Sequence, residues 1–188
     1  MDTSVIVIVI IVGLLLLAVF YVIGVYNKLV NARNKVDNQF SQIDVQLKRR
    51  ADLIPNLVNS VKGYMSHEQS IIDSVTKARE NLVKADDADE MAEANQELTT
   101  ALNNLFVIVE NYPELKSNTN FIQLQDELAG TENRISVARN DYNDAVKTYN
   151  KAIKSFPKNI LAGMFGFEEK EYFEANVSSS DVPEVSFE

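Results

Sequence analysis

A histidine beside a glutamate is the pair of residues in this chain that comes nearest to catalytic chemistry. His67 is the chain's one histidine, and Glu68 follows it directly. Such a pair could act in acid–base catalysis, but a general base needs a nucleophile or a substrate pocket around it, and the neighbouring sequence supplies neither. Residues of this kind also stand at helix starts for capping alone. We favour capping, and we predict no catalytic residue.

A cluster of carboxylates is the nearest approach to a metal site. It reads Asp86-Asp87-Ala88-Asp89-Glu90, without the glycine and the spaced ligands of a calcium-binding helical loop. A solvated turn that leads into the acidic first turn of a helix is the favoured interpretation. The chain has no cysteine, which excludes disulfides, thiol catalysis and thiolate metal sites. We therefore predict no metal site and no cofactor.

A basic triplet, Lys48-Arg49-Arg50, is more informative. Arg50 falls on an apolar helical stripe, where it replaces a hydrophobic residue. One interpretation is an arginine that is paired within the helical bundle or reaches its edge. Another is a contact with an acidic partner helix or subunit. Pairing within the bundle is favoured, and the role of the three residues stays open.

Charge is distributed unevenly along the 188 residues, whose net charge is −9. The stretch from residue 26 to residue 50 has six bases and two acids, whereas the stretch from residue 168 to the end has seven acids and one lysine. The basic part follows an apolar run, as expected for a protein that starts at an anionic membrane surface. Nucleic-acid binding is not expected, because it would need a more basic domain. No small-molecule substrate is evident either.

The apolar run extends from Val5 to Val25 and has no charged side chain. As a helix it would be roughly 32 Å long, which matches a hydrocarbon core of about 30 Å. A cleaved signal peptide is the competing interpretation, but the run is too long, no base precedes it and no cleavage motif follows. Because bases flank only its C-terminal side, we expect residues 1–4 outside the cell and the rest of the chain in the cytoplasm.

The remainder predicts a bundle of about four long antiparallel helices with coiled-coil-like packing. No glycine or proline separates the first helix from the apolar run before Pro55, so we expect the membrane helix to continue into the bundle. Apolar residues recur every three or four positions in each helix. The predicted core positions are Val36, Phe40, Ile43, Leu47, Ile54, Leu57, Val61 and Tyr64; Ile71, Val75, Ala78, Leu82 and Ala85; Met91, Ala94, Leu98, Ala101, Leu105, Ile108 and Tyr112; and Phe121, Leu128, Ile135, Tyr142, Tyr149 and Phe156, with Leu124, Thr131, Ala138, Ala145 and Ala152 between them.

The end of the chain divides into an apolar patch and an acidic tail. The patch runs from Ile160 to Phe167 and includes two glycines, and it could pack on the bundle, contact another subunit or dip into the membrane surface. Packing on the bundle is the simplest interpretation. Residues 26–167 are predicted to form the helical domain, and residues 168–188 a largely disordered tail.

Several blocks of this sequence resemble the LemA family. They are residues 41–58 (SQIDVQLKRRADLIPNLV), Gly63-Tyr64, His67-Glu68, residues 110–118 (ENYPELKSN), Phe121 with Leu124-Gln125, Thr131-Glu132, Arg134-Ile135, Ala138-Arg139, Tyr142-Asn143, Tyr149-Asn150 and Phe156-Pro157. The resemblance implies an N-terminal membrane helix, an outside N-terminus and a helical cytoplasmic domain. It implies no enzymatic activity. Because relatives include a protein implicated in building magnetosome membranes, it also implies a role in membrane organisation.

These observations favour a bacterial single-pass protein of the inner membrane, with the lipid bilayer as its first partner. We expect a non-enzymatic helical scaffold that forms homo-oligomers and organises the membrane or membrane proteins. The first alternative is a regulatory adaptor for a membrane enzyme such as a protease, which would have a membrane-protein partner. The second is a hydrolase with an unrecognised site.

Overall fold

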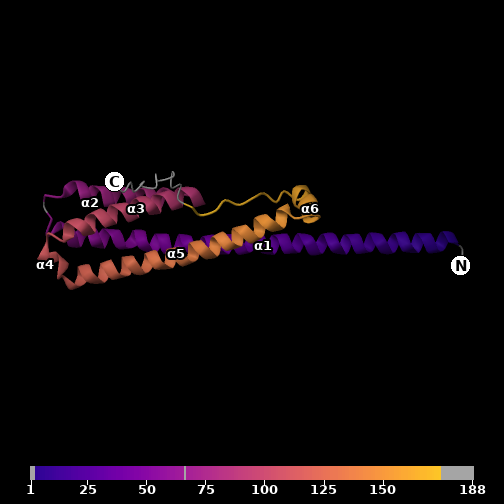
Figure 1. Cartoon of the computed structure of the whole chain (residues 1–188), viewed down its shortest axis with the longest axis horizontal. Helices are drawn as coiled ribbons and strands as arrows, with labels where there is room; N and C mark the ends of the chain where they lie inside the picture. The colour runs from indigo at the N-terminus through magenta and orange to yellow at the C-terminus, as the bar shows by residue number, and fades with distance from the viewer. Residues whose placement is uncertain (1–2, 66, 175–188) are drawn as a thin grey trace, which may run out of the picture. The chain divides into compact units, whose positions relative to one another are not determined.

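The computed structural model describes residues 3–65 and 67–174, which form helices and no strand. The all-α prediction is confirmed (Figure 1). The four predicted runs correspond to α1, α2, α3 and α5, and two short helices, α4 and α6, are additional. The helices are α1 (Thr3–Lys62), α2 (Gln69–Lys84), α3 (Ala88–Val109), α4 (Pro113–Lys116), α5 (Thr119–Lys154) and α6 (Lys158–Met164).

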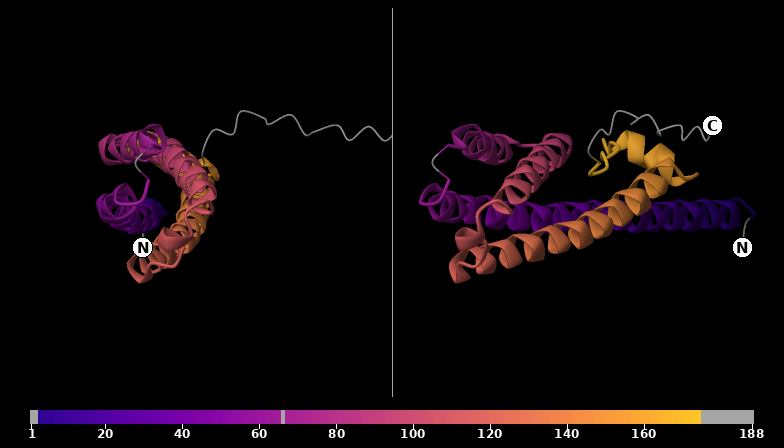
Figure 2. Two further views of the ribbon diagram at one scale, coloured as in Figure 1. Left: turned by 90° about the vertical axis from the view of Figure 1, so that its left-hand side faces the viewer. Right: turned by 60° about the vertical axis from the view of Figure 1, so that its left-hand side comes forward.

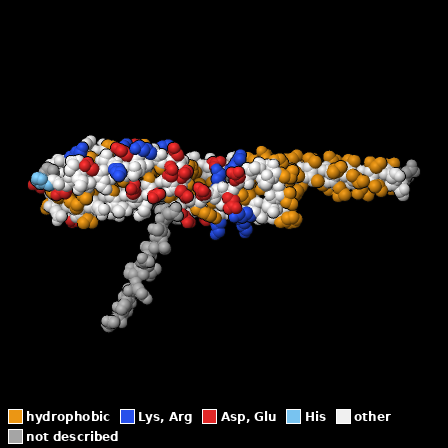
Figure 3. Space-filling model, turned by 90° about the horizontal axis from the view of Figure 1, so that it is seen from above, with side chains coloured by type: hydrophobic (Ala, Val, Ile, Leu, Met, Phe, Trp, Pro, Cys, Tyr) orange, Lys and Arg blue, Asp and Glu red, His pale blue; other side chains and the backbone are white. Residues whose placement is uncertain are grey.

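The first helix contains both the apolar run and the first part of the bundle. It continues through Pro55 without interruption for 60 residues and ends before Gly63. Its N-terminal part is long and apolar enough to cross a membrane, and none of that stretch is buried inside the molecule. Figure 3 shows this part of α1 as a hydrophobic surface without charged side chains. The prediction of one helix that continues from the apolar run into the bundle is confirmed.

The chain divides into two compact units, to which α1 and α5 both contribute. The first consists of Met1–Ser41 and Asn140–Glu171, and the second of Gln42–Arg139 and Tyr172–Glu188. In the second unit, α2 and α3 pack against each other as a hairpin (Figure 1). Phe106 of α3 meets Phe121 of α5 edge to face, with ring centroids 6.3 Å apart. Arg79 of α2 donates a hydrogen bond to the Ala51 carbonyl of α1.

The core of the second unit follows the predicted periodicity closely. Ile43, Leu47, Ile54, Leu57 and Val61 of α1 are all buried, as are Leu98 and Leu105 of α3 and Phe121, Leu128 and Ile135 of α5. One predicted core position of this unit is exposed, and five are only half-buried: Ile71, Ala85, Ile108, Tyr112 and Leu124. Tyr64 is exposed, because α1 ends at Lys62 and the stripe ends with it. In α2, Ile72 rather than the neighbouring Ile71 is fully buried.

The first unit combines α1 up to Ser41 with the C-terminal part of α5 and with α6, which follows α5 after a short turn (Figure 2). Tyr142, Ala145 and Tyr149 are buried as predicted. The prediction for Phe156 is wrong, since its side chain is 81% exposed. The reason is that α5 ends at Lys154, so Phe156 lies in the turn before α6 and not on the helical stripe.

The acidic segment after Phe167 begins as ordered chain and not as a tail. The Tyr149 hydroxyl donates to the Glu168 carbonyl at 2.8 Å, and the Tyr142 hydroxyl donates to the Glu171 carbonyl at 2.9 Å. Between them, the Asn150 side chain donates to the Lys170 carbonyl at 2.8 Å and accepts from the Lys170 amide at 3.0 Å. The sequence places the tail from residue 168, but this backbone is held against α5. Residues 175–188 of the predicted tail lie outside the described residues.

Candidate functional site

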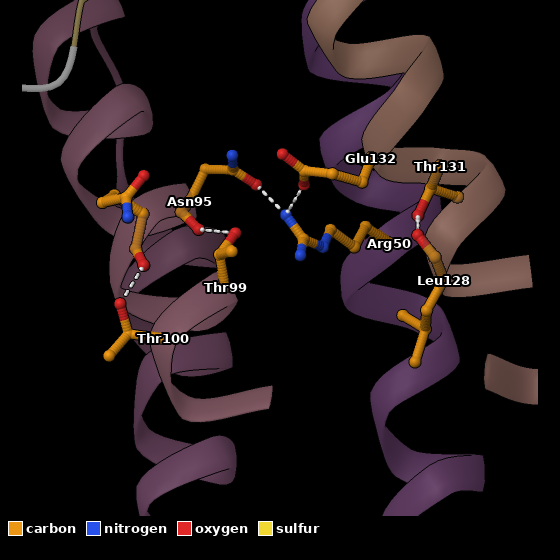
Figure 4. Close-up of polar contacts among 8 residues, drawn as sticks. Arg50, Asn95, Thr99, Thr100, Leu128, Thr131 and Glu132 are labelled. Atoms are coloured by element: carbon orange, nitrogen blue, oxygen red, sulfur yellow. Dashed lines mark hydrogen bonds and ion pairs between the residues drawn. The ribbon is translucent and has the colours of Figure 1, made fainter. Parts of the chain in front are cut away.

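Arg50 lies at the centre of the second unit, on the buried side of α1. Its helical stripe is otherwise apolar, and the periodicity that buries Leu47 and Ile54 also buries Arg50, which is only 3% exposed. Its Nη1 donates to Oδ1 of Asn95, from α3, at 2.5 Å. The same nitrogen donates to the carboxylate of Glu132, from α5 (Figure 4). One guanidinium group therefore connects three helices.

In this arginine cluster, which consists of Arg50, Asn95 and Glu132, the guanidinium of Arg50 loses contact with water and gains one counter-charge, the carboxylate of Glu132. Burial lowers the pKa of Arg50, and the charge of Glu132 opposes that shift. The Nε atom of Arg50 is buried and has no hydrogen-bond partner among the described residues. Glu132 is half-buried, so its carboxylate keeps some contact with water. In such a buried pair desolvation offsets much of the attraction, whereas removal of one partner is costly because it leaves a buried charge unpaired.

The other two bases of the triplet pair on the surface. Lys48 bonds Asp44 one turn away on α1 at 2.7 Å, and Arg49 bonds Glu127 of α5 at 2.9 Å. Exposed pairs of this kind contribute roughly 0–1 kcal/mol each. The favoured prediction of pairing within the bundle is confirmed for Arg50. Arg49 also pairs with another helix, whereas the Lys48 pair lies along α1. Their partners Asn95, Glu127 and Glu132 are separated from them by long stretches of sequence, so the sequence could not identify them.

The arginine cluster offers no reactive group. The nearby Thr131 hydroxyl is buried and donates its proton to the Leu128 carbonyl of the same helix, α5, at 2.7 Å (Figure 4). A hollow elsewhere in the unit is an open polar groove of about 500 Å³ between α2 and α3, lined by Ser74, Lys77, Ala78, Glu93, Gln96, Glu97, Thr100, Ala101 and Asn104. In the groove, the Thr100 hydroxyl donates to the Gln96 carbonyl of its own helix at 3.0 Å. The contacts of the arginine cluster therefore support a role in helix packing.

His67 and Glu68 lie at the start of α2. His67 is exposed, while Glu68 is the N-cap residue and its carboxylate accepts a hydrogen bond from the Tyr112 hydroxyl. That hydrogen bond is the main cause of the raised pKa of Tyr112. Glu68 makes no side-chain cap to the helix backbone. It therefore attaches the start of α2 to the chain before α4, which the sequence did not suggest.

The carboxylates at 86–90 form the start of α3. Asp87 is its N-cap and accepts a hydrogen bond from the Glu90 amide at 2.8 Å, while the Glu90 carboxylate accepts one from the Asp86 amide at 3.2 Å. The predicted turn and acidic first turn are confirmed. Within residues 3–65 and 67–174, no three acidic or histidine side chains come close enough to hold a metal ion.

The apolar patch at residues 160–167 belongs to the first unit and has two sides. Ala162 and Phe167 are buried, whereas Ile160, Met164 and Phe165 are exposed. Packing on the protein, the simplest interpretation of the sequence, therefore describes only part of the patch. Tyr26 contacts a ring from each side: its ring centroid lies 5.0 Å from that of the exposed Phe165 and 5.8 Å from that of the buried Phe167. Sequence reasoning placed both regions but had no signal that they touch.

Comparison with known proteins gives a consistent result. The model of the LemA family matches residues 39–187, which include the arginine cluster and begin after the apolar run. Magnetosome protein MamQ 2 of Paramagnetospirillum magneticum is 27% identical over 187 residues, covering 86% of this chain and 68% of the relative. Protein LemA of Metamycoplasma hominis is 26% identical over 133 residues, covering 69% and 61%. Magnetosome protein MamQ of Magnetospirillum gryphiswaldense is 25% identical over 174 residues, covering 79% and 64%.

Proposed function

The chain belongs to the LemA family, and we propose that it is a non-enzymatic, membrane-anchored scaffold. Its apolar run spans the membrane, and its helical domain self-associates and organises the membrane or other membrane proteins. The domain lies in the cytoplasm of a bacterial cell, with the N-terminus outside the inner membrane. No substrate, cofactor or nucleic acid enters this proposal.

The continuity of α1 is the observation that carries the proposal. One uninterrupted helix, Thr3–Lys62, supplies the apolar run and then the buried residues Ile43, Leu47 and Ile54 of the second unit. A span that belongs to the same helix as the domain's core cannot leave the bilayer without carrying the domain with it. This is the anchoring that a membrane scaffold needs, whereas a soluble enzyme would gain nothing from it.

Self-association is supported by apolar side chains on the outer faces of the second unit. Val107 of α3 is 70% exposed, and Val45, Val83 and Val137 are also exposed. Single exposed apolar residues are ordinary on a monomer. In a membrane-anchored protein, however, neighbours share one plane, and the high effective concentration multiplies weak contacts. Two relatives with the name magnetosome protein fit a role at an organised membrane.

The orientation follows from the bases on α1. Lys28, Arg33 and Lys35 follow the apolar run within about ten residues, and these residues are exposed. Lysine and arginine beside a span are retained on the cytoplasmic side. These bases therefore support the proposal of a helical domain inside the cell.

The scaffold is tested by light scattering of the full-length protein in mild detergent over a wide concentration range. We expect a protein mass that is a multiple of that of one chain. Val107→Ser combined with Val137→Ser should raise the dissociation constant about tenfold or more, since each valine that becomes buried contributes on the order of 1 kcal/mol. Asn103→Ser with Asn133→Ser, exposed positions one turn away on the same helices, should leave it unchanged. A monomer at all concentrations would contradict the scaffold and favour an adaptor with a different partner.

A further inference from the structure

We propose that α6 and the exposed residues Ile160, Met164 and Phe165, here called the interfacial patch, lie in the membrane–water interface beside the span. The protein would then contact the same leaflet at two places, through α1, which crosses it, and through α6, which lies at its surface. This inference rests on the proposed function in one respect, because it takes the N-terminal part of α1 to cross the bilayer. The occupant of the patch is the lipid surface and not a second protein.

Tyr26 fixes the position of α6 along α1. It is the first residue after the apolar run of residues 5–25. Because that run matches the thickness of the hydrocarbon core, Tyr26 lies at the boundary with the headgroups, where aromatic side chains gather. The Phe165 ring meets the Tyr26 ring edge to face, with centroids 5.0 Å apart. Phe165, and α6 with it, is thereby held at the depth of that boundary.

The end of α6 has a geometry that divides the patch into a packed and an exposed side. The Phe167 amide donates to the Ala162 carbonyl at 2.9 Å and the Gly166 amide donates to the Gly163 carbonyl at 3.4 Å, which is the Schellman pattern of a helix C-terminus. Gly166 has φ of +69°, a conformation that favours glycine. The turn directs Phe167 inward, where Arg33 stacks over its ring at 5.5 Å. Phe165 stays on the exposed side.

The exposed side of α6 has the composition of a surface that meets lipid. Ile160 and Met164 are four positions apart, so they share one face of the helix, and Met164 is 73% exposed. Phe156, just before α6, is exposed as well. Residues 155–167 contain Lys158 and no acidic residue. A short apolar face accompanied by a lysine binds the boundary between headgroups and acyl chains of anionic membranes.

A second copy of the chain is the other occupant that an apolar face could have. The position of the patch favours lipid, because a surface held beside the end of a span meets headgroups before it meets another subunit. The test must nevertheless separate the two. The chain has no cysteine, so one introduced cysteine provides a single labelling site in the full-length protein without other changes.

The experiment uses full-length Met164→Cys carrying an environment-sensitive fluorophore, reconstituted in vesicles of phosphatidylcholine and phosphatidylglycerol. Spin-labelled lipids with the nitroxide near the headgroup should quench it about twofold or more, because an interfacial helix lies roughly 5–10 Å into the boundary. Ile122→Cys, at an exposed apolar position of α5, is the matched control and should not be quenched. Leu15→Cys, within the span, should be quenched by lipids labelled deep in the acyl chain.

The outcomes separate the inference from the proposed function. Deep quenching at Leu15→Cys with no more quenching at Met164→Cys than at Ile122→Cys would overturn the interfacial patch and leave the span in place. Absence of quenching at Leu15→Cys would overturn the membrane anchor itself. Unquenched Met164→Cys that forms disulfide-linked dimers in the unlabelled protein would assign the patch to a second copy and would also overturn the inference.

Discussion

The guanidinium of Arg50 and the side-chain oxygen of Asn95 meet 2.5 Å apart in the interior of the second unit, although 45 positions separate them in the chain. The contact gives a direct prediction, because each group is buried and depends on the other. Asn95→Leu should destabilise the protein by about 1–3 kcal/mol, since a buried guanidinium N–H loses its acceptor. Chemical denaturation of the full-length protein in mild detergent, followed by circular dichroism, measures the free energy of unfolding.

The matching double variant shows whether the loss arises from the unpaired charge. Arg50→Met with Asn95→Leu replaces both polar groups by apolar ones, and such replacements are often neutral or stabilising. We expect the double variant to recover most of the stability that Asn95→Leu alone loses. Two additive losses would contradict the coupling of Arg50 and Asn95 and would leave the cavity or strain of each substitution as the cause.

The fourth predicted helix gives a second prediction, which concerns packing in the first unit. Ala145 of α5 is buried, and a larger side chain has to displace its neighbours. Ala145→Leu should cost on the order of 1–3 kcal/mol of unfolding free energy. Asn140→Leu, at an exposed position of the same helix, should cost far less. Equal losses from the two variants would show that the register of α5 is wrong.

Tyr149 gives a prediction about alkaline pH. Burial is the main cause of its raised pKa. The charge of Arg33 lowers the pKa somewhat, and the charges of Asp37 and Glu168 raise it. Because tyrosine is neutral when protonated, a raised pKa means that the folded state holds this proton more tightly than the unfolded state does. The stabilisation is therefore complete below about pH 10, the ordinary pKa of tyrosine, and is lost as the pH rises through the higher value of the folded protein.

The measurement compares wild type with Tyr149→Phe. At pH 8 the variant should be less stable by about 0.5–1.5 kcal/mol, because it lacks the hydrogen bond to the Glu168 carbonyl. Above pH 10 the difference between the two proteins should shrink. A difference that stays constant up to pH 11 would contradict the burial of an un-ionised Tyr149 hydroxyl.

The orientation in the membrane gives the last prediction. Asn103→Cys places a thiol on an exposed part of α3. In intact cells it should resist a membrane-impermeant thiol reagent, and after lysis it should react, because the bases after the span hold the domain inside. Ready labelling in intact cells would reverse the proposed topology. Labelling is measured by the mass shift of the purified protein.

Two corrections to the predicted core show that helical periodicity does not predict burial beyond the end of a helix. Tyr64 and Phe156 continue the spacing of buried residues, yet both are exposed. Each lies just beyond the end of its helix, after Lys62 and after Lys154. Periodicity assigns a side chain to a face only while the helix continues, and helix ends are set by the turn that follows and by what that turn contacts.

The sequence by itself determined the all-α class, the continuous first helix, its apolar membrane-length part and most of the buried stripe, because each depends on residues close together in the chain. Only the tertiary structure decided which partners Arg50 has, that residues 168–171 pack against α5, and that Phe165 and Phe167 meet Tyr26. These contacts join segments from 19 to more than 100 positions apart. Many pairings of helices bury the same apolar stripes, so periodicity cannot select among them, whereas the polar and aromatic contacts form in one arrangement alone.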